Sequence, residues 1–578
     1  MALNMKSENN LKLHLLTALS VIIVLAFDVF FALQKEGYHM DEILSYELSN
    51  SEFTPWITPT QPEGRLEKYY RNEIHDDRFS RTVSNLLTQV YDIAVRRGGS
   101  VAASYTADVY ENPQWMTEDD ITKYVTFYGS DSVIALSAYY NSTTDNHPPL
   151  YFMLINILSA LWSLFAYGRL SVWPGIILNM IFMAGSLLVI CAFFKNIAGR
   201  PYLGPLASIV YGLSPAGLNT VLLIRMYCMT SFFCLAFTYV LFLKLQHEDE
   251  PRYRNRLLTL ITVLGFLTQY FVCIYYFFLT LCVLVYLIRM KKKGVLKGTV
   301  KSLVISAVIG LITYPFVYHD LFGTTIGNSV MENMSGISGY FEKLILFGGI
   351  IAKECAGSTV SLFVMIAVMI IALIISVKTG KVKVWAVSPA LSAAMYYLVV
   401  SKIAPYTVDR YLMPVLGVVI ICFVIAVSFV IRQLTDKFIS SEKSRNTIGA
   451  CLGVLICGVC TAFVFMNDPG YLYKGYTAQL KISEVYESLD AVVVYQGTSF
   501  YQNVPELMNY DNCLLVNKDE LPVYDENLAS HDKIIVIEGA GVNRDEVLTT
   551  LGDMYGYSSV AVLMEDGVFG DRVCLLSK

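Results

Sequence analysis

Long hydrophobic runs separated by short polar segments dominate the pattern of this chain. About 20 consecutive apolar residues are enough for a helix to cross the hydrocarbon core of a bilayer. The pattern therefore predicts an all-α polytopic membrane protein. The runs cover Leu13–Leu33 and residues 148–166, 172–194, 202–222, 226–246, 256–271, 272–290, 298–318, 359–377, 384–402, 411–432 and 446–466.

A long polar segment, residues 34–147, separates the first two runs. Loops of this length are usually functional or disordered. A helical pattern at Arg81–Arg96 and many aromatic residues predict a large, structured first outer loop that folds against the membrane face. These aromatic residues include Trp56, Tyr69, Tyr70, Trp115, Tyr124, Phe127 and Tyr128.

Basic segments orient the expected spans, because cytoplasmic loops carry an excess of Lys and Arg. Arg289–Lys301, Lys378–Lys383 and Arg432–Arg445 are predicted to be cytoplasmic, as is the N-terminus with Lys6 and Lys12. If Lys195 is also cytoplasmic, only one of the two runs at 148–166 and 172–194 can cross the membrane. We expect His147–Phe165, which opens with two prolines, to be a juxtamembrane or re-entrant helix. About 11 spans remain, and the C-terminus lies outside.

Composition supports this class: 55% of the residues are hydrophobic and only 16% are charged, whereas soluble proteins carry about a quarter charged residues. The mean hydropathy is +0.50. No cluster of Cys and His residues predicts a zinc site. Cys513 and Cys574 lie in the polar tail, and a disulfide between them is left open by their spacing.

The tail, residues 467–578, changes character sharply. Ala491–Tyr495, Cys513–Val516 and Lys533–Glu538 have the pattern of buried strands, and Val485–Leu489 and Arg544–Leu551 that of helices. Alternating strands and helices predict a small extracytoplasmic α/β domain with a partly parallel sheet, next to a membrane domain of residues 1–466. Gly539-Ala540-Gly541 follows a strand but lacks the third glycine of a dinucleotide fingerprint.

Two acidic residues, Asp41 and Glu42, stand in the stretch GYHMDEILSYELSN just after the first run. A carboxylate at the outer membrane face can act as a general base or bind a metal ion. An acidic end to a helix or loop is the alternative. His147, in Asp145-Asn146-His147-Pro148-Pro149, can polarise a substrate, ligate a metal ion or donate to phosphate. A hydrogen-bonded capping histidine is the alternative there.

Two motifs with arginine and tyrosine, Arg225-Met226-Tyr227 and Asp409-Arg410-Tyr411, precede apolar runs on the same predicted face. A guanidinium at headgroup level suits a phosphate or diphosphate through bidentate bonds. The alternative is an interfacial anchor with an aromatic belt residue. Lys402 is a third cation near this face.

The order of these motifs resembles that of the GT-C superfamily of membrane glycosyltransferases. HMDE after the first span, NHPPLYF at the close of the first outer loop, Arg-x-Tyr and a late Arg-Tyr carry the resemblance. It covers about Leu13–Met466, and it is nearest to bacterial family-39-like enzymes, relatives of protein O-mannosyltransferases and aminoarabinose transferases. The tail lies outside it.

The resemblance implies a polyprenyl-phosphate sugar as lipid donor, a hexosyl or pentosyl group, and transfer with inversion to an extracytoplasmic acceptor hydroxyl. It implies Asp41 as base, Glu42 as its support or as a group that orients the acceptor, and His147 beside the pocket. The resemblance further implies that the donor phosphate is held by residues of the arginine–tyrosine motifs and the nearby lysine: Arg225, Tyr227, Lys402, Arg410 and Tyr411.

Some relatives bind a divalent metal cation and others do not. Asp41, Glu42 and His147 are the candidates for a metal ion here, although no DxD motif stands beside Asp41. The expected location is a bacterial plasma membrane, with no nucleic acid as partner.

Two other functions fit parts of the pattern. The first alternative is a transporter or flippase of lipid-linked glycans, although no internal repeat is present and the candidate charges lie at the outer boundary. The second alternative is a non-catalytic assembly or sensor protein. The sugar, the acceptor and the oligomeric state are not predicted by the sequence.

Overall fold

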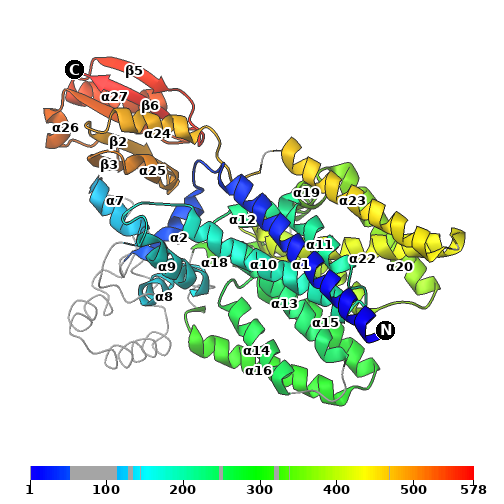
Figure 1. Cartoon of the computed structure of the whole chain (residues 1–578). Coiled ribbons are helices and arrows are strands. Elements are labelled where there is room, and N and C mark those ends of the chain that lie inside the picture. Colours follow the sequence, from blue (N-terminus) through cyan, green and yellow to red (C-terminus); the bar gives the residue numbers. More distant parts are fainter. Residues whose placement is uncertain are drawn as a thin grey trace.

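The computed structural model describes residues 2–51, 113–127, 135–143, 145–246, 252–317, 325–336, 339–439, 441–467 and 469–578. The helical pattern at Arg81–Arg96 and the aromatic residues Trp56, Tyr69, Tyr70 and Tyr128 lie outside these ranges. Figure 1 shows a bundle of helices with a small sheet domain at one end and the N-terminus at the other.

Long apolar helices form the bundle, as the hydrophobic pattern predicts. In the described ranges, nine helices are long and apolar enough to cross a membrane, by length and composition. The chain is therefore an integral membrane protein. These helices are α1 (Ala2–Ala32), α10 (Trp173–Asn196), α13 (Tyr227–Leu245), α15 (Val272–Arg289), α16 (Lys293–Thr313), α20 (Thr359–Lys378), α21 (Val384–Ile403), α22 (Met413–Phe438) and α23 (Glu442–Met466).

Two of the 11 expected spans are not single long helices. The run at 202–222 is split into α11 (Leu203–Gly212) and α12 (Pro215–Leu222), because Ser214 caps α12 and Pro215 opens it. Proline lacks an N–H group and disfavours helical backbone at the residue before it. The run at 256–271 gives α14 (Arg252–Phe266), which is 15 residues long and opens with three arginines.

The helix after His147 is short. α9 (Leu150–Ser163) has 14 residues, which correspond to about 21 Å at 1.5 Å per residue. A bilayer core is about 30 Å thick. The length of α9 thus agrees with the expected juxtamembrane or re-entrant helix.

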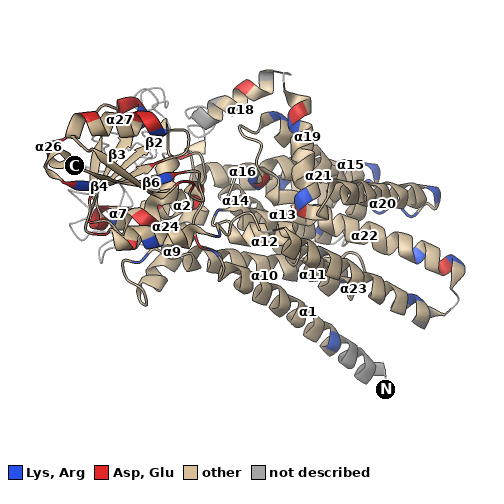
Figure 2. Ribbon diagram, turned by 90° about the horizontal axis from the view of Figure 1, so that it is seen from above, with Lys and Arg blue, Asp and Glu red and all other residues tan. Residues whose placement is uncertain are grey.

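Charged residues are distributed unevenly along the bundle. Figure 2 shows Lys and Arg at the helix ends farthest from the sheet domain, around α15, α20, α22 and α23. Arg289 lies in the last turn of α15 and Lys378 in the last turn of α20. This agrees with the expected cytoplasmic placement of the basic loops, which stays a prediction.

The tail forms the expected partly parallel α/β domain. Its sheet has the strand order β1-β3-β2-β4-β6-β5. β2 (Ala491–Tyr495) pairs in parallel with β3 (Asn512–Asn517) and β4 (Lys533–Glu538). β6 (Arg572–Ser577) pairs antiparallel with β4 and with β5 (Ser559–Met564). Every residue of β2 is buried, as expected for a strand covered on both faces.

One strand of this sheet comes from the first outer loop. β1 (Gln114–Thr117) pairs antiparallel with β3, and the Trp115 indole donates to Asp525 Oδ2 at 2.8 Å. β1 leads into α7 (Glu118–Val125), which contacts α2 (Met40–Asn50). The loop therefore joins the tail domain to the segment that carries Asp41.

For the tail, one question that the sequence left open is answered and one expectation is wrong. Cys513 and Cys574 are free, buried cysteines on β3 and β6, which β2 and β4 separate in the sheet. A helix was expected at Val485–Leu489. The structure instead has α24 at Tyr476–Val485, so the helix ends at the residue where it was expected to begin. The helix expected at Arg544–Leu551 is α27 (Arg544–Tyr555).

Candidate active site

The acidic pair lies in the first turn of α2. His39 is the N-cap: its Nδ1 accepts from the Asp41 backbone N–H at 3.1 Å, while the His39 backbone N–H donates to Glu42 Oε2 at 2.7 Å. This reciprocal pattern is a capping box, which satisfies two otherwise free backbone donors. Acidic side chains at a helix N-terminus are also favoured by the helix dipole. The local sequence HMDE thus starts α2 and directs the two carboxylates apart.

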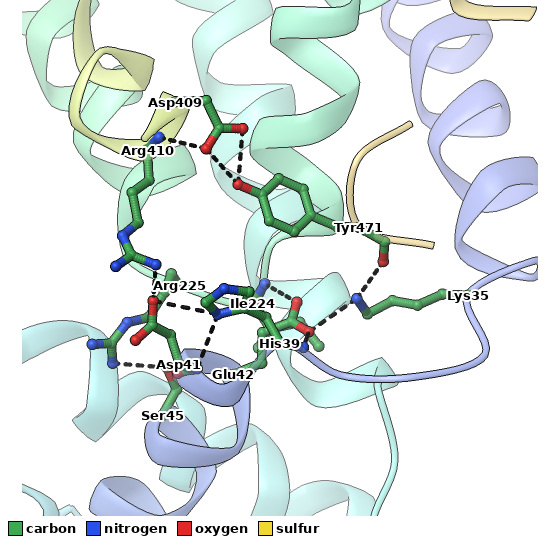
Figure 3. A network of polar contacts seen from close by, with 10 residues as sticks. All are labelled: Lys35, His39, Asp41, Glu42, Ser45, Ile224, Arg225, Asp409, Arg410 and Tyr471. Atoms are coloured by element: carbon green, nitrogen blue, oxygen red, sulfur yellow. Dashed lines mark hydrogen bonds and ion pairs between the residues drawn. The ribbon is translucent and has the colours of Figure 1, made fainter. Parts of the chain in front are cut away.

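Asp41 lies between two guanidinium groups that come from distant parts of the chain. Arg410, in the 3-10 turn η3 (Asp409–Tyr411), donates to Asp41 Oδ2. Arg225, between α12 and α13, approaches from another side and donates to Ser45 Oγ at 3.1 Å (Figure 3). The Asp41 and Arg410 side chains are 14% and 18% exposed, so the pair remains reachable from outside the protein.

The two cations control the protonation of Asp41. Burial by itself raises the pKa of the Asp41 carboxyl, but the positive charges of Arg225 and Arg410 outweigh burial and hold this pKa at about 2. Asp41 is therefore an anion at neutral pH. While Arg410 stays bound to it, Asp41 is a weak proton acceptor.

Glu42 points away from Asp41 into a closed environment. Its carboxylate accepts from Lys35 Nζ at 3.0 Å and from the Ile224 backbone N–H at 2.8 Å, and the Lys35 and Glu42 side chains are both fully buried. Its acceptor sites are thus used within the protein. This geometry favours Glu42 as a support for the helix start that carries Asp41 over direct contact with an acceptor.

Arg225 has an unused hydrogen-bond donor. The residue is 3% exposed, and its guanidinium carbon lies 5.7 Å from the centroid of the Phe152 ring. Within the described residues, its Nε has no hydrogen-bond partner. Leaving a buried donor unpaired costs about 1–3 kcal/mol. A negatively charged ligand beside Asp41 would remove that cost.

The linker to the tail domain holds the other arginine. The Tyr471 hydroxyl donates to Asp409, with its oxygen 2.7 Å from Oδ1 and 2.8 Å from Oδ2, and Asp409 Oδ1 accepts the Arg410 backbone N–H at 2.8 Å. The Tyr471 carbonyl accepts from Lys35 Nζ at 2.6 Å. One linker residue thus contacts both the turn that bears Arg410 and the lysine that pairs with Glu42 (Figure 3).

The tail domain also contacts α2 directly. The Tyr501 hydroxyl, in the 3-10 turn η4 (Ser499–Asn503), donates to Glu47 Oε2 in the middle of α2. Glu47 is fully buried. α2 is therefore fixed at its start by Lys35 and Ile224 and in its middle by the tail domain.

The remaining predicted residues divide into near and distant ones. His147 pairs with Asp145 through Nδ1 at 2.8 Å, and its charge is among those that lower the pKa of Asp41. Tyr227 is buried at the first residue of α13, and Tyr411 follows Arg410 and packs its ring 5.2 Å from that of Phe271. Lys402 lies 5.6 Å from the centroid of the Tyr340 ring and is not part of the network in Figure 3.

The donor set around Asp41 does not fit a metal ion. Asp41 is bound by Arg410, Glu42 by Lys35 and His147 by Asp145. Among the described residues no group of three or more His, Cys, Asp or Glu side chains is arranged to hold a metal ion. Cations of the protein already pair with both carboxylates, so no chemical step here is assigned to a metal ion.

Several residues of the site were assigned no role from the sequence. His39, Lys35, Ser45, Asp409 and Tyr471 join it through contacts with Asp41, Glu42 and the two arginines. A signal existed for His39, since a capping residue is expected just before an acidic first turn. Lys35 and Tyr471 are 436 positions apart in the sequence, so no local pattern predicts their contact.

An acid inside α1 also escaped the sequence patterns. Asp28 is fully buried within the candidate span Asn10–Ala32, and neither of its carboxyl oxygens has a hydrogen-bond partner in the described part of the chain. Ionisable residues within membrane spans are rare and often functional.

Comparisons with known proteins give structural matches alone. No family model and no curated protein matches the sequence. The fold is similar to ArnT from Cupriavidus metallidurans bound to undecaprenyl phosphate, with a TM-score of 0.45 and 11% identity over 86% of this chain and 98% of that one. The apo state of the same protein matches with a TM-score of 0.42 and 12% identity, over 86% of this chain and 98% of that one.

The archaeal oligosaccharyltransferase AglB from Archaeoglobus fulgidus, solved with an inhibitory peptide and a dolichol-phosphate, matches with a TM-score of 0.44 and 10% identity. That match covers 96% of this chain and 74% of the other.

Proposed function

We propose that this protein is a membrane glycosyltransferase that moves a sugar from a polyprenyl-phosphate donor to a hydroxyl group of an extracytoplasmic acceptor, with inversion at the anomeric carbon. The observation that carries the proposal is the placement of one reachable carboxylate, Asp41, between two guanidinium groups. A transferase of this kind needs a proton acceptor for the attacking hydroxyl and positive charge for the departing phosphate.

Arginine suits the donor part of the reaction. A guanidinium can give two parallel hydrogen bonds to a phosphate group. Arg225 has Nε unpaired, and Arg410 is committed to Asp41 by one contact that a phosphate can replace. We expect the donor phosphate to bind both arginines and to draw Arg410 away from Asp41.

Donor binding would then activate the base. When Arg410 turns to the phosphate, one cation no longer neutralises Asp41, and its pKa rises from about 2 toward the ordinary carboxyl range. Asp41 Oδ2 becomes free to accept the proton of the acceptor hydroxyl. Coupling of base activation to donor binding would limit proton transfer to the complex that holds the donor.

The reaction balances with these groups. The acceptor oxygen forms a bond to the anomeric carbon on the face opposite the phosphate, while its proton passes to Asp41. The bond between the anomeric carbon and the phosphate oxygen breaks, and the electron pair leaves with the lipid phosphate. Arg225 and Arg410 stabilise that charge, so no acid is needed to protonate the leaving group. Attack from the opposite face gives inversion.

Transfer from radiolabelled polyprenyl-phosphate sugars in membranes that contain the purified protein tests this proposal. Hexosyl and pentosyl donors should be offered in turn with a mixture of envelope acceptors. We expect label in an acceptor and release of polyprenyl phosphate in equal amounts. Arg225→Gln and Arg410→Gln should each raise the KM for the donor, whereas Arg432→Gln, at an exposed position of α22, should not. The absence of transfer with every donor would refute the proposal.

A transporter or flippase of lipid-linked glycans is the second candidate, and Asp28 is the observation that favours it. An unpaired carboxyl inside a span is a feature of proton-coupled transporters. Reconstituted vesicles with fluorescent lipid-linked glycan separate the two functions. Movement between leaflets without release of polyprenyl phosphate, abolished by Asp28→Asn, would support the transporter.

A further inference from the structure

A groove runs between α14 and α16 on the bundle, away from the candidate active site. It has a volume of about 530 Å³, within the range of roughly 300–1,000 Å³ that is typical of ligand sites. The far end of α14 lies near the outer side, because the Leu267 carbonyl, just after α14, accepts from the Leu150 N–H, close to His147. The Arg252 end of α14, which is 15 residues long, therefore points away from the outer side.

The entrance of the groove is positively charged. Arg256 of α14 and Lys301 of α16 both line it, and both are exposed. Each is the last charged residue before its helix becomes continuously uncharged. The two cations thus lie at the same level along the two helices, toward the ends that face away from the candidate active site. Neither forms an ion pair with any other part of the chain that the structure describes.

Neutral polar groups line the groove next to these cations. Asn255, Thr259 and Ser302 all lie in it. The Asn255 side-chain oxygen accepts from Lys244 Nζ at 2.5 Å and from Ser302 Oγ at 3.4 Å. The amide nitrogen of Asn255 is left as a donor. Two cations and an amide donor at one entrance are complementary to an anion that offers several acceptor oxygens.

The inner part of the groove is apolar. Leu260 and Val263 of α14 face the same cavity as Ile305 and Ile309 of α16. Both helices run from the charged end toward the outer face, so these residues lie deeper than the cations. From Arg256 to Val263 the rise is about 10 Å, and from Lys301 to Ile309 about 12 Å. This depth matches part of an acyl chain beneath a headgroup.

The geometry points to a specific site for one anionic phospholipid of the leaflet opposite the candidate active site. Its phosphate contacts Arg256 and Lys301, its headgroup hydroxyls contact Asn255 and Ser302, and one acyl chain lies along the apolar part. Basic pockets between membrane helices bind lipid headgroups in this way. A free anion would leave the apolar half unused, and a zwitterionic headgroup would place its own amine against the two cations. This site is independent of the proposed glycosyl transfer.

Native mass spectrometry of the purified full chain, titrated with phosphatidylglycerol or phosphatidylcholine in detergent, tests the site. We expect one tightly held phosphatidylglycerol and no equivalent phosphatidylcholine. Arg256→Gln/Lys301→Gln should weaken that binding roughly 30-fold, about fivefold for each cation at a membrane surface. The control, Lys378→Gln/Lys381→Gln, removes the same charge at the end of α20 and should leave the bound lipid unchanged.

A second variant separates the groove from surface charge. Leu260→Trp fills the apolar part at a residue that is 53% exposed and keeps both cations. The tightly held lipid should be lost in this variant as well. Equal binding of both lipids by the wild type, unchanged binding by the double variant, or competition by millimolar inorganic phosphate would each overturn the assignment. If the double variant does not fold, the Leu260→Trp result decides.

Discussion

Replacement of Lys35 by methionine should destabilise the protein through Glu42. The two side chains are fully buried and 3.0 Å apart. Methionine fills a similar volume but leaves the Glu42 carboxylate without its cation. Removal of one partner of a buried ion pair typically costs about 3–5 kcal/mol, because the other charge stays buried and uncompensated.

The structure places the expected cost at the lower end of that range. Glu42 keeps the His39 and Ile224 backbone N–H donors at 2.7 and 2.8 Å, which offset part of the loss. Lys35 also donates to the Tyr471 carbonyl at 2.6 Å, so the linker loses one contact. We expect a loss of about 3 kcal/mol in the free energy of unfolding.

Thermal unfolding in nanodiscs, followed by tryptophan fluorescence, measures this effect. Lys35→Met should lower Tm by several degrees, and the double variant Lys35→Met/Glu42→Gln should recover more than half of that loss, because the buried charge is gone. Lys381→Met, at an exposed lysine, is the control. A Lys35→Met protein as stable as the wild type, or additive effects in the double variant, would refute the reasoning.

Three further predictions concern the site and the tail. Tyr471→Phe removes the hydroxyl that donates to Asp409. It should lower kcat/KM for the donor about tenfold, since hydrogen bonds to charged groups contribute about 1.5–3 kcal/mol. Tyr473→Phe in the same linker is the control, and equal activity of both variants would contradict the positioning role of Tyr471. Arg410→Gln should move the acid limb of the pH profile of kcat/KM upward, because kcat/KM reports the free enzyme, in which loss of this cation raises the pKa of Asp41 from about 2. An unmoved acid limb of kcat/KM would count against Asp41 as the titrating base. Burial, assisted by the charge of Asp571, raises the pKa of Glu506 from 4.5 to about 8, so the folded state holds an extra proton between these values and stability falls as pH rises through this window. Glu506→Gln imitates the protonated form and should flatten that dependence, with a gain on the order of 3 kcal/mol at pH 8 in chemical denaturation; a variant as pH-sensitive as the wild type would exclude Glu506 as the source.

Local patterns were sufficient for most of the bundle and the central strands. A run of 20 apolar residues has few alternatives to a membrane helix, and β-branched runs such as AVVVY at Ala491–Tyr495 favour buried strands. The break at Ser214-Pro215 was present in the sequence, but the surrounding residues are apolar, so the hydrophobic pattern concealed it. The run at 256–271 was expected to be a full membrane span, but the apolar part of α14 is too short for one.

Contacts between distant segments account for what the sequence did not predict. Asp41 and Arg410 could be placed on one face by topology, but their direct pairing spans 369 positions. A four-residue strand in a polar loop, β1, gives no strong signal until its partner β3 is known. Lys35 follows a span, where lysines commonly reach toward water, and its burial depends on the Tyr471 linker.

The most direct measurement of the central claim is single-turnover transfer from a radiolabelled polyprenyl-phosphate sugar, with wild type compared with Asp41→Asn. Asparagine keeps the size of the side chain and cannot accept the proton. We predict that the variant still binds the donor, because Arg225 and Arg410 remain, while the transfer rate falls at least 100-fold, on the order of a general base's contribution. Equal transfer rates for the two proteins would contradict Asp41 as the base.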